Sequence, residues 1–368
     1  MISSRYEMSR LFHDTNAFKI IKIYHSIINR GALMNRSTQE QDTPSITVLM
    51  SVYNGARWLS ESIKSVLDQT FRDFEFIIVD DGSTDNSVEI LELFKAQDRR
   101  IIIISKPNTG LADSLNQGIQ KARGDWIARL DADDICEITR FEKQIERARS
   151  NSKLVFIGTG LTIINEFGTK EKIYSYPSQH EFLLRNLITA RKFPAHSSSF
   201  YLTQVIRDLG GYRSRVKLSE DIDLWLRLSE VGELTSLSEP LVQLRRHSEQ
   251  ISHDDAGKRQ LFDSIIAIVS YWIRKLGGTD PVDADETSFL TFIAWLQTRL
   301  NKDGFFESHA HFAQCRSLIR EDVKSFRVIR KLLESCFLHP VFTALFIKNK
   351  IWGEMLTHQL ALDWLHQK

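Results

Sequence analysis

Ile46-Thr47-Val48-Leu49-Met50-Ser51-Val52-Tyr53-Asn54 opens the stretch, ending at Asp134, that decides the fold of this chain. Two further segments follow within it, Val79-Asp80-Asp81-Gly82-Ser83-Thr84-Asp85 and Arg129-Leu130-Asp131-Ala132-Asp133-Asp134. In each segment a mostly apolar run ends and acidic or small polar residues follow. Open α/β sheets bind ligands at the carboxyl ends of their strands, and acidic groups gathered there repel one another unless a cation or hydrogen-bond donors offset the charge. The stretch therefore predicts a site for a metal-bound, phosphorylated ligand.

Strand and helix patterns alternate through this stretch. Apolar runs predict one strand that begins at Ile46 and others at Phe76 to Val79, Ile101 to Ile104 and Trp126 to Leu130. Between these runs, apolar residues recur at helical spacing. Four strands that alternate with helices predict an α/β fold with a doubly wound, mostly parallel sheet.

The pattern loosens beyond Asp134. We expect a helix at Phe141 to Ala148 that packs its apolar residues on the sheet. Two short strands, at Leu154 to Gly158 and Leu161 to Ile164, and a turn at Asn165 to Gly168 should follow. The acidic pair Glu220-Asp221 enters a strongly amphipathic helix. After His253 the composition is typical of helices.

Size and composition describe a soluble, globular chain. It has 368 residues, of which 42% are hydrophobic and 26% are charged. A formal charge of +1, from 48 basic and 47 acidic residues, argues against nucleic acid as a partner. Cys136, Cys315 and Cys336 have no metal-ligand spacing, and the N-terminus lacks the apolar core of a signal peptide. We therefore expect a reduced, cytoplasmic protein without a membrane span.

Each acidic cluster, taken alone, has two interpretations. Asp131, Asp133 and Asp134 carry the oxygen ligands that Mg²⁺ or Mn²⁺ prefer, although acidic residues are also common in turns and at helix starts. The pair Asp80-Asp81 suits a turn, or a carboxylate that accepts hydrogen bonds from a base or ribose. Because this pair follows the second predicted strand, a phospho-receiver signalling domain is disfavoured. Neither a Gly-rich phosphate loop nor a dinucleotide fingerprint is present in the sequence.

Together, the motifs between residues 45 and 252 resemble family 2 glycosyltransferases of the GT-A fold, most nearly bacterial enzymes that build lipopolysaccharide, capsule or exopolysaccharide. The resemblance rests on Ser51-Val52-Tyr53-Asn54-Gly55, Ser65-Val66-Leu67-Asp68-Gln69-Thr70-Phe71, Val79 to Asp85, Asn108-Thr109-Gly110-Leu111, Ser114-Leu115-Asn116, Ala128 to Asp134 and Glu220-Asp221. These motifs occur in the family's order and approximate spacing. The resemblance implies a nucleotide-sugar-binding sheet followed by a helical C-terminal region.

The resemblance also implies roles for residues of the donor site. Tyr53 would lie beside the nucleotide base, and Asp81 would recognise uracil. Asp131 would lie near the ribose, and Asp133 would ligate the Mn²⁺ or Mg²⁺ ion that bridges the diphosphate. Arg129 would contact a phosphate or support a neighbouring side chain. The implied donor is a UDP-sugar.

In the acceptor half, the resemblance assigns Asp221 as the catalytic base of an inverting enzyme. A carboxylate held by the dipole of a helix N-terminus is the structural alternative for this residue. Arg245-Arg246-His247 resembles a loop that closes over the diphosphate, which gives His247 a donor-binding role. His196 matches another subgroup position, whereas Trp225 is expected to pack in the core before it would stack on an acceptor.

The implied activity is transfer of a hexose or N-acetylhexosamine to a glycan or lipid-linked acceptor during surface polysaccharide synthesis. Processive synthases of this family carry Gln-x-x-Arg-Trp and membrane spans, whereas Gln243 is followed by Leu244-Arg245-Arg246-His247. This departure favours addition of one sugar per encounter. Two alternatives remain open: a sugar nucleotidyltransferase and a non-catalytic sugar-nucleotide-binding protein.

The motifs divide the chain into an N-terminal extension at 1–44, a glycosyltransferase domain at 45–252 and a helical C-terminal region at 253–368. The domain comprises a donor half, 45–134, and an acceptor half, 135–252. An amphipathic patch at Phe18 to Ile28 would pack on the body, bind a partner or lie on a membrane surface. An apolar, basic segment at Phe326 to Trp352 would pack within the helical region or lie on a membrane surface. A lipid-linked acceptor would bring the protein to the inner membrane face. The sequence specifies no oligomeric state.

Overall fold

The computed structural model describes residues 43–189, 191–248, 256–302 and 352–367. Of these residues, 43–186 and 192–248 form one compact unit, and the others form a second. The first unit is built on a nine-stranded sheet.

The first half of the sheet is parallel, as the alternating pattern predicts. Its strands lie in the order β3-β2-β1-β4, with bounds β1 Ile46–Val52, β2 Phe74–Asp80, β3 Ile101–Ser105 and β4 Trp126–Arg129. Helices α3 Ala56–Leu67, α4 Ser87–Gln97 and α5 Leu111–Lys121 connect them. Every residue of β2 is buried, as expected for a strand covered on both faces.

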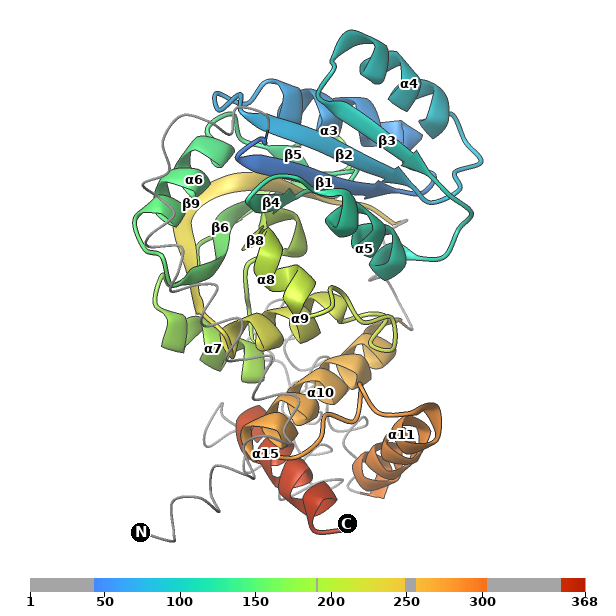
Figure 1. Cartoon of the computed structure of the whole chain (residues 1–368), viewed down its shortest axis with the longest axis vertical. Coiled ribbons are helices and arrows are strands. Elements are labelled where there is room, and N and C mark those ends of the chain that lie inside the picture. The colour runs from blue at the N-terminus through green and yellow to red at the C-terminus, as the bar shows by residue number, and fades with distance from the viewer. Residues whose placement is uncertain (1–42, 190, 249–255, 303–351, 368) are drawn as a thin grey trace, which may run out of the picture. The chain divides into compact units, whose positions relative to one another are not determined.

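The strand order also determines which face each helix covers. Crossover connections between parallel strands are right-handed. The chain moves outward from β1 to β2 to β3, so α3 and α4 lie on one face, and it returns to β4 through α5 on the other face (Figure 1). The carboxyl ends of β1, β2 and β4 consequently meet at one edge of the sheet.

The second half of the sheet is mixed in direction. Its order continues β4-β8-β6-β9-β5, and β7 pairs with β6 beyond the end of β8. The bounds are β5 Ile135–Cys136, β6 Leu154–Asn165, β7 Lys170–Tyr174, β8 Phe200–Leu202 and β9 Glu233–Arg246. The predicted parallel arrangement therefore holds for the first four strands, and antiparallel pairs appear only beyond β4.

The two short strands predicted at Leu154 to Gly158 and Leu161 to Ile164 are one continuous strand, β6. The register against β9 shifts on both sides of Gly160. A Cβ on this glycine would lie 2.6 Å from the carbonyl oxygen of Ser238 and 2.8 Å from that of Tyr174. The glycine thus allows a close approach of three backbones, and it marks an irregularity within a strand. The turn predicted at Asn165 to Gly168 is confirmed, because Gly168 N donates to Asn165 O at 3.0 Å.

Short helices complete the first unit. They are α6 Arg140–Arg149, α7 His180–Ile188, the 3-10 helix η1 His196–Ser198, α8 Thr203–Asp208 and α9 Glu220–Ser229. The buried residues of α6 include Phe141, Ile145 and Ala148, as the sequence predicts. After α8, Gly210 and Gly211 both adopt positive φ, a conformation that glycine tolerates without strain, and this turn redirects the chain toward α9.

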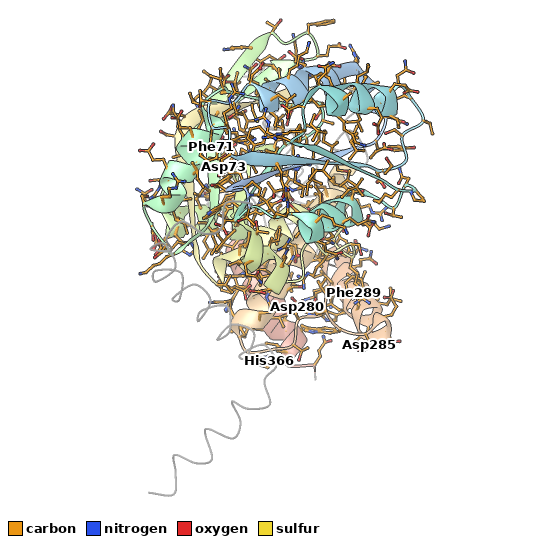
Figure 2. All side chains as sticks on the ribbon, turned by 45° about the horizontal axis from the view of Figure 1, so that its top comes forward. Phe71, Asp73, Asp280, Asp285, Phe289 and His366 are labelled. Atoms are coloured by element: carbon orange, nitrogen blue, oxygen red, sulfur yellow. The ribbon has the colours of Figure 1, made fainter. Side chains whose placement is uncertain are left out.

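The described part of the second unit is helical, which confirms the prediction for this region. It contains α10 Ala256–Lys275, α11 Glu286–Lys302 and α15 Trp352–Leu365. Asp285, labelled in Figure 2, precedes α11 and accepts a hydrogen bond from Ser288 N at 3.0 Å. The side-chain and backbone hydrogen bonds from Ser288 hold the pKa of Asp285 below its ordinary value, as expected for a helix cap.

None of the helices in the described ranges is both long and apolar enough to cross a bilayer. The predicted amphipathic patch at 18–28 lies outside the described residues. The segment predicted at 326–352 also lies outside them, except for Trp352 at the start of α15.

The close approach of Gly124 to β1 leads to a test of the fold. A Cβ at this position would lie 2.3 Å from Thr47 N and 2.5 Å from Ile46 C, and these backbone atoms cannot move without disturbing the sheet. We expect Gly124→Ala to lower the free energy of unfolding by about 1–3 kcal/mol, measured by urea denaturation. Gly118→Ala is the matched control because the atoms nearest to its Cβ belong to the Leu49 side chain and not to backbone. Equal losses in the two variants would contradict this explanation.

Candidate functional site

The site lies where the parallel strands end. Tyr53 directly follows β1 and is 53% exposed, whereas Asp81 directly follows β2 and is buried. Arg129 is the last residue of β4 and pairs in register with Leu49 of β1. Asp131 follows two residues later. Since β1 lies between β2 and β4, the sheet brings the candidates for binding the nucleotide base, Tyr53 and Asp81, to the same edge as Asp131 of the acidic loop.

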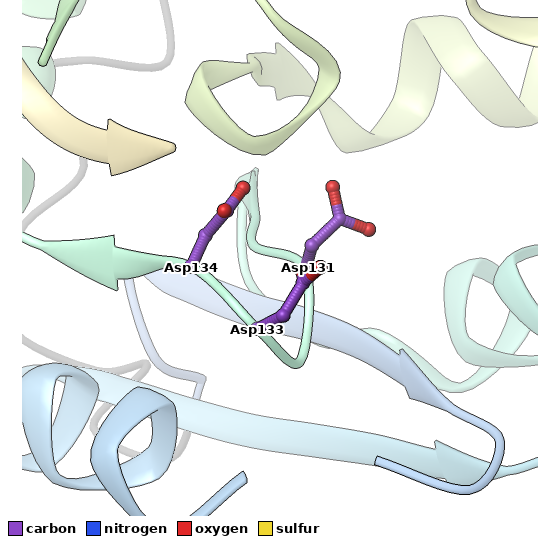
Figure 3. A group of neighbouring side chains, drawn as sticks. All are labelled: Asp131, Asp133 and Asp134. Atoms are coloured by element: carbon purple, nitrogen blue, oxygen red, sulfur yellow. The ribbon is translucent and has the colours of Figure 1, made fainter. Parts of the chain in front are cut away.

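Three carboxylates converge in the loop between β4 and β5. Asp131, Asp133 and Asp134 each offer an oxygen within 4.8 Å of the others (Figure 3). Asp134 is buried, whereas the side chains of Asp131 and Asp133 are 38% and 27% exposed. The two carboxylates of the Asp-x-Asp pattern, Asp131 and Asp133, are therefore accessible, whereas that of Asp134 is not.

Asp131 is held by the arginine that ends the preceding strand, β4. Arg129, which is 1% exposed, forms an ion pair with Asp131 Oδ2 through Nη1. Burial alone would raise the pKa of Asp131, but the adjacent guanidinium outweighs it and holds the pKa below its ordinary value. Asp131 is therefore ionised at neutral pH, and Arg129 acts first as its partner.

Asp133 is held by a histidine from the far end of the domain. His247 Nε2 donates to Asp133 Oδ2 at 2.8 Å, and the His247 ring packs against Trp58 of α3 with 4.1 Å between ring centroids. Burial and the charge of Asp131 raise the pKa of Asp133, while the His247 hydrogen bond acts in the opposite direction. The structure thus brings together two residues predicted from motifs more than 100 positions apart.

The two oxygens of Asp134 have different partners. Oδ1 accepts a hydrogen bond from Arg245 N at 2.8 Å, and Oδ2 is hydrogen-bonded to the hydroxyl of Ser197. Burial and the two neighbouring carboxylates raise the pKa of Asp134 well above its ordinary value. In contrast, Oδ1 of Asp131 and Oδ1 of Asp133 accept no hydrogen bond from another described residue. The chemistry of this donor set fits a hard divalent cation, with Asp131 and Asp133 as its available ligands.

Arg245 ties this loop to its surroundings, although the sequence analysis assigned it no role beyond its motif. Its Nε donates to Asp133 O at 3.0 Å, and Nη1 donates to Glu166 O at 3.3 Å in the β6–β7 turn. Nη2 forms an ion pair with Glu61 of α3. A fully buried guanidinium with these contacts fixes the backbone at Asp133.

Asp81 is also fixed from a distant segment. Oδ1 accepts a hydrogen bond from Thr109 N, and Oδ2 accepts one from Gly110 N, both at 2.9 Å. Lys106 adds an ion pair to Oδ1, and its own side chain is 7% exposed. The sequence analysis missed Lys106; a lysine two residues after the predicted strand Ile101 to Ile104 was the available signal.

Asp221 lies in the first turn of α9 and is partly exposed. Burial raises its pKa to about 6, against the lowering effects of a hydrogen bond from Ile222 N and of Arg129. The charge of Asp131 contributes a further rise. The charges of Arg129, at the end of β4, and of Asp131, just after it, are therefore both felt at Asp221. The neighbouring Glu220 is more buried, and burial with the charge of Asp221 raises its pKa to about 8.

His196 belongs to a buried hydrogen-bond chain. Its Nε2 lies 2.6 Å from the hydroxyl of Tyr212, which lies 3.0 Å from the hydroxyl of Tyr201. Burial and the charge of Arg129 lower the pKa of His196 well below its ordinary value, so the imidazole is neutral. Trp225 is 3% exposed and lies among aromatic rings, which confirms core packing.

The loop before α9 is anchored by a buried carboxylate. Asp223 accepts hydrogen bonds from Arg213 Nε at 2.9 Å and from Arg227 Nε at 3.0 Å. Arg227 Nη2 also donates to Gly211 O at 2.8 Å. These contacts fix the segment that carries Tyr212 against the helix that carries Asp221.

Comparison with known proteins agrees with this arrangement. Residues 47–210 match the pattern of Glycosyl transferase family 2. Over 227 residues the chain is 37% identical to the putative glycosyltransferase EpsE of Bacillus subtilis. The matched region covers 60% of this chain and 77% of EpsE. The chain belongs to glycosyltransferase family 2. It is also 33% identical to the O-antigen biosynthesis glycosyltransferase WbnJ of Escherichia coli over 210 residues, or 55% of this chain and 80% of WbnJ.

The fold is likewise confirmed as GT-A. The crystal structure of residues 1–349 of S. aureus TarS in complex with UDP-GlcNAc superposes with a TM-score of 0.53 at 16% identity. The match covers 88% of this chain and 92% of the TarS chain. The expectations of a family 2 glycosyltransferase and of an α/β nucleotide-sugar-binding fold are both confirmed.

The crowding of the carboxylates predicts a gain in stability when one charge is removed. The pKa of Asp133 is raised in the folded chain, so its ionised form weakens folding at pH values above that pKa. We expect Asp133→Asn to raise the free energy of unfolding of the metal-free protein at pH 7.5 by about 0.5–2 kcal/mol. The gain should shrink as the pH is lowered through the raised pKa of Asp133, because the wild-type carboxyl then becomes protonated. Urea titrations in EDTA measure it.

The exposed Asp125 supplies the control, because Asp125→Asn removes an equal charge outside the cluster. A wild-type protein as stable as the Asp133→Asn variant at pH 7.5 would show that the carboxylates do not strain the fold.

Proposed function

We propose that this glycosyltransferase is inverting and metal-dependent, and that it moves a hexose or N-acetylhexosamine from a UDP-sugar to a glycan or lipid-linked acceptor. The observation that carries the proposal is the pairing of accessible carboxylate oxygens on Asp131 and Asp133 with a separate carboxylate, Asp221, near the same strand end. One set suits a cation and a diphosphate, and the other suits a proton acceptor.

The metal would be held by the accessible carboxylates of Asp133 and Asp131, and His247 would support Asp133. A bound Mn²⁺ or Mg²⁺ ion would offset the charge that develops on the departing nucleoside diphosphate. His247 donates to the far oxygen of Asp133, which orients the near oxygen as a ligand. The Trp58 ring packed on His247 restricts the imidazole to that orientation.

The donor base would lie between Tyr53 and Asp81. Tyr53 offers an exposed ring for stacking, and Asp81 is held by Lys106 and two backbone N–H groups. A carboxylate has about four acceptor positions, so Asp81 can still accept an N–H from uracil. TarS of S. aureus, which shares the fold, has been solved with UDP-GlcNAc. This supports a UDP-sugar as the donor.

Asp221 would be the catalytic base. Its pKa of about 6 leaves it ionised at pH 7, whereas the pKa of about 8 keeps Glu220 mostly protonated. Two adjacent carboxyl groups with separated pKa values indicate which one accepts a proton. Asp221 would take the proton of the acceptor hydroxyl while its oxygen bonds to the anomeric carbon. The bond from that carbon to the diphosphate breaks, and UDP leaves with the electron pair.

The acceptor is proposed from the relatives. WbnJ is named for O-antigen biosynthesis, and this supports a role in surface polysaccharide synthesis. A lipid-linked acceptor would place the reaction at the cytoplasmic face of the inner membrane, with the protein in peripheral contact.

The proposal is tested by incubating the full chain with Mn²⁺, a panel of nucleotide sugars and acceptor glycans. Release of UDP that depends on acceptor and stops in EDTA is expected. Release of pyrophosphate would instead identify a sugar nucleotidyltransferase, and donor binding without turnover would identify a non-catalytic binding protein. Product anomers resolved by NMR would reveal whether the configuration is inverted.

Asp221→Asn tests the base. The amide keeps the shape of the carboxylate but cannot accept a proton, so we expect the turnover number to fall by about 10²- to 10⁴-fold. Binding of the UDP-sugar, measured by calorimetry, should be unchanged because Asp221 does not hold the donor. Asp125→Asn is the control for loss of one negative charge. Normal turnover by Asp221→Asn would exclude this residue as the base.

The rate should also depend on pH. Since Asp221 must be ionised to accept a proton, and burial raises its pKa to about 6, we expect the turnover number to fall about tenfold per pH unit below that value. Above pH 7 this group causes no further change. Turnover at saturating donor and Mn²⁺ measures the effect, and Mn²⁺ binding at each pH separates it from loss of the metal. A flat profile down to pH 4.5 would contradict the assignment.

A further inference from the structure

The hydroxyl of Ser197 lies between the carboxylates of Asp131 and Asp134, although Ser197 comes from a different part of the chain. Ser197 lies in η1 and is 1% exposed. Its Oγ accepts hydrogen bonds from Asp131 N at 3.0 Å and from Arg129 Nη1 at 3.2 Å. The same oxygen lies 2.7 Å from Asp131 Oδ2 and is also hydrogen-bonded to Asp134 Oδ2.

Four polar groups surround this hydroxyl, which has three hydrogen-bonding positions, so its single hydrogen is shared by two acceptors. A serine oxygen has two lone pairs and one hydrogen. The lone pairs take the two N–H donors, from Asp131 and Arg129, and the hydrogen lies between two carboxylate oxygens. Both Oδ2 atoms are therefore directed at Ser197, which leaves Oδ1 of Asp131 turned away from it.

We propose that Ser197 is a positioning residue for the cation site: it orients the carboxylate of Asp131 and separates it from that of Asp134. This inference rests on the proposed function, because it takes Asp131 and Asp133 as the residues that hold the metal. Ser197 touches neither metal nor substrate, and acts by fixing the direction of its carboxylate partners. Such partners govern metal affinity because they fix ligand geometry before the ion binds.

Ser197 also connects the two halves of the domain. Its neighbour His196 is hydrogen-bonded to Tyr212, in the segment that is anchored to α9. Thus η1 contacts the carboxylate cluster through Ser197 and the segment near Asp221 through His196. The position of Asp131 depends on a residue of the acceptor half.

Ser198 offers a closely matched control. It lies in the same short helix and is fully buried. Its hydroxyl donates to Ala195 O at 2.9 Å and lies 3.5 Å from Thr159 N, so its partners are backbone groups. Loss of this hydroxyl disturbs η1 as much as loss of the other, without a direct effect on a carboxylate.

The test compares Mn²⁺ affinity in full-length Ser197→Ala and Ser198→Ala, measured from the electron paramagnetic resonance signal of free Mn²⁺. We expect Ser197→Ala to bind Mn²⁺ about 10- to 100-fold more weakly, and Ser198→Ala to bind as the wild type does. UDP affinity measured in EDTA should be equal in all three proteins. Ser197→Thr, which keeps the hydroxyl, should restore most of the Mn²⁺ affinity.

If Ser197→Ala does not fold, Ser197→Cys replaces it, because the thiol fills similar space but forms weaker hydrogen bonds; the same loss is expected. Wild-type Mn²⁺ affinity in Ser197→Ala or Ser197→Cys would overturn the positioning role. Equal losses in the Ser197 and Ser198 variants would also overturn it, because the effect would then be a general one on η1. A wild-type protein that binds UDP but no Mn²⁺ would overturn the metal dependence itself, and with it this inference.

Discussion

Mutual repulsion among three carboxylates is the constraint on which the rest of the site depends. Asp131, Asp133 and Asp134 lie within 4.8 Å of one another at a strand end, where charges are poorly screened by water. Each carboxylate has its own partner: Arg129, His247 or the backbone amide of Arg245. The neighbouring structure supplies enough donors to hold the cluster, but not enough to saturate its accessible oxygens. Such a cluster is well suited to accept a cation.

The donors from Arg245 and His247 lie beside the acidic loop because the two-residue strand β5 pairs with β9 in a defined register. β5 follows the acidic loop directly and pairs with β9, with Ile135 opposite Gln243. The residues that continue β9 are then carried past the loop in the opposite direction. Arg245 and His247 consequently reach Asp134 and Asp133. A slip of one residue in this pairing would bring different residues of β9 beside the acidic loop, so the short β5–β9 pairing matters for the site.

The later part of the first unit meets the cluster through η1, and α9 is linked to η1 by the loop before it. Ser197 bonds to two of the carboxylates, and His196 bonds to Tyr212 in the loop before α9. Asp223 anchors that loop through arginine side chains. The proposed base, Asp221, is therefore not carried by a free loop. Its place relative to the proposed cation site is determined by buried polar contacts. Removing one partner of such a contact leaves a buried polar group unpaired, which lowers the stability of the fold.

The sequence by itself determined the parallel half of the sheet, because uninterrupted apolar runs between helical patterns have few other solutions. It also determined that carboxylates collect after β2 and β4, and motif order indicated Asp221 and His247. Only the tertiary structure decided the mixed half of the sheet, the continuity of β6 and the partners of each carboxylate. Local patterns report which face of a strand is buried, but Ser197 and Lys106 contact carboxylates that are separated from them by whole helices and strands, and these contacts depend on how the strands pair.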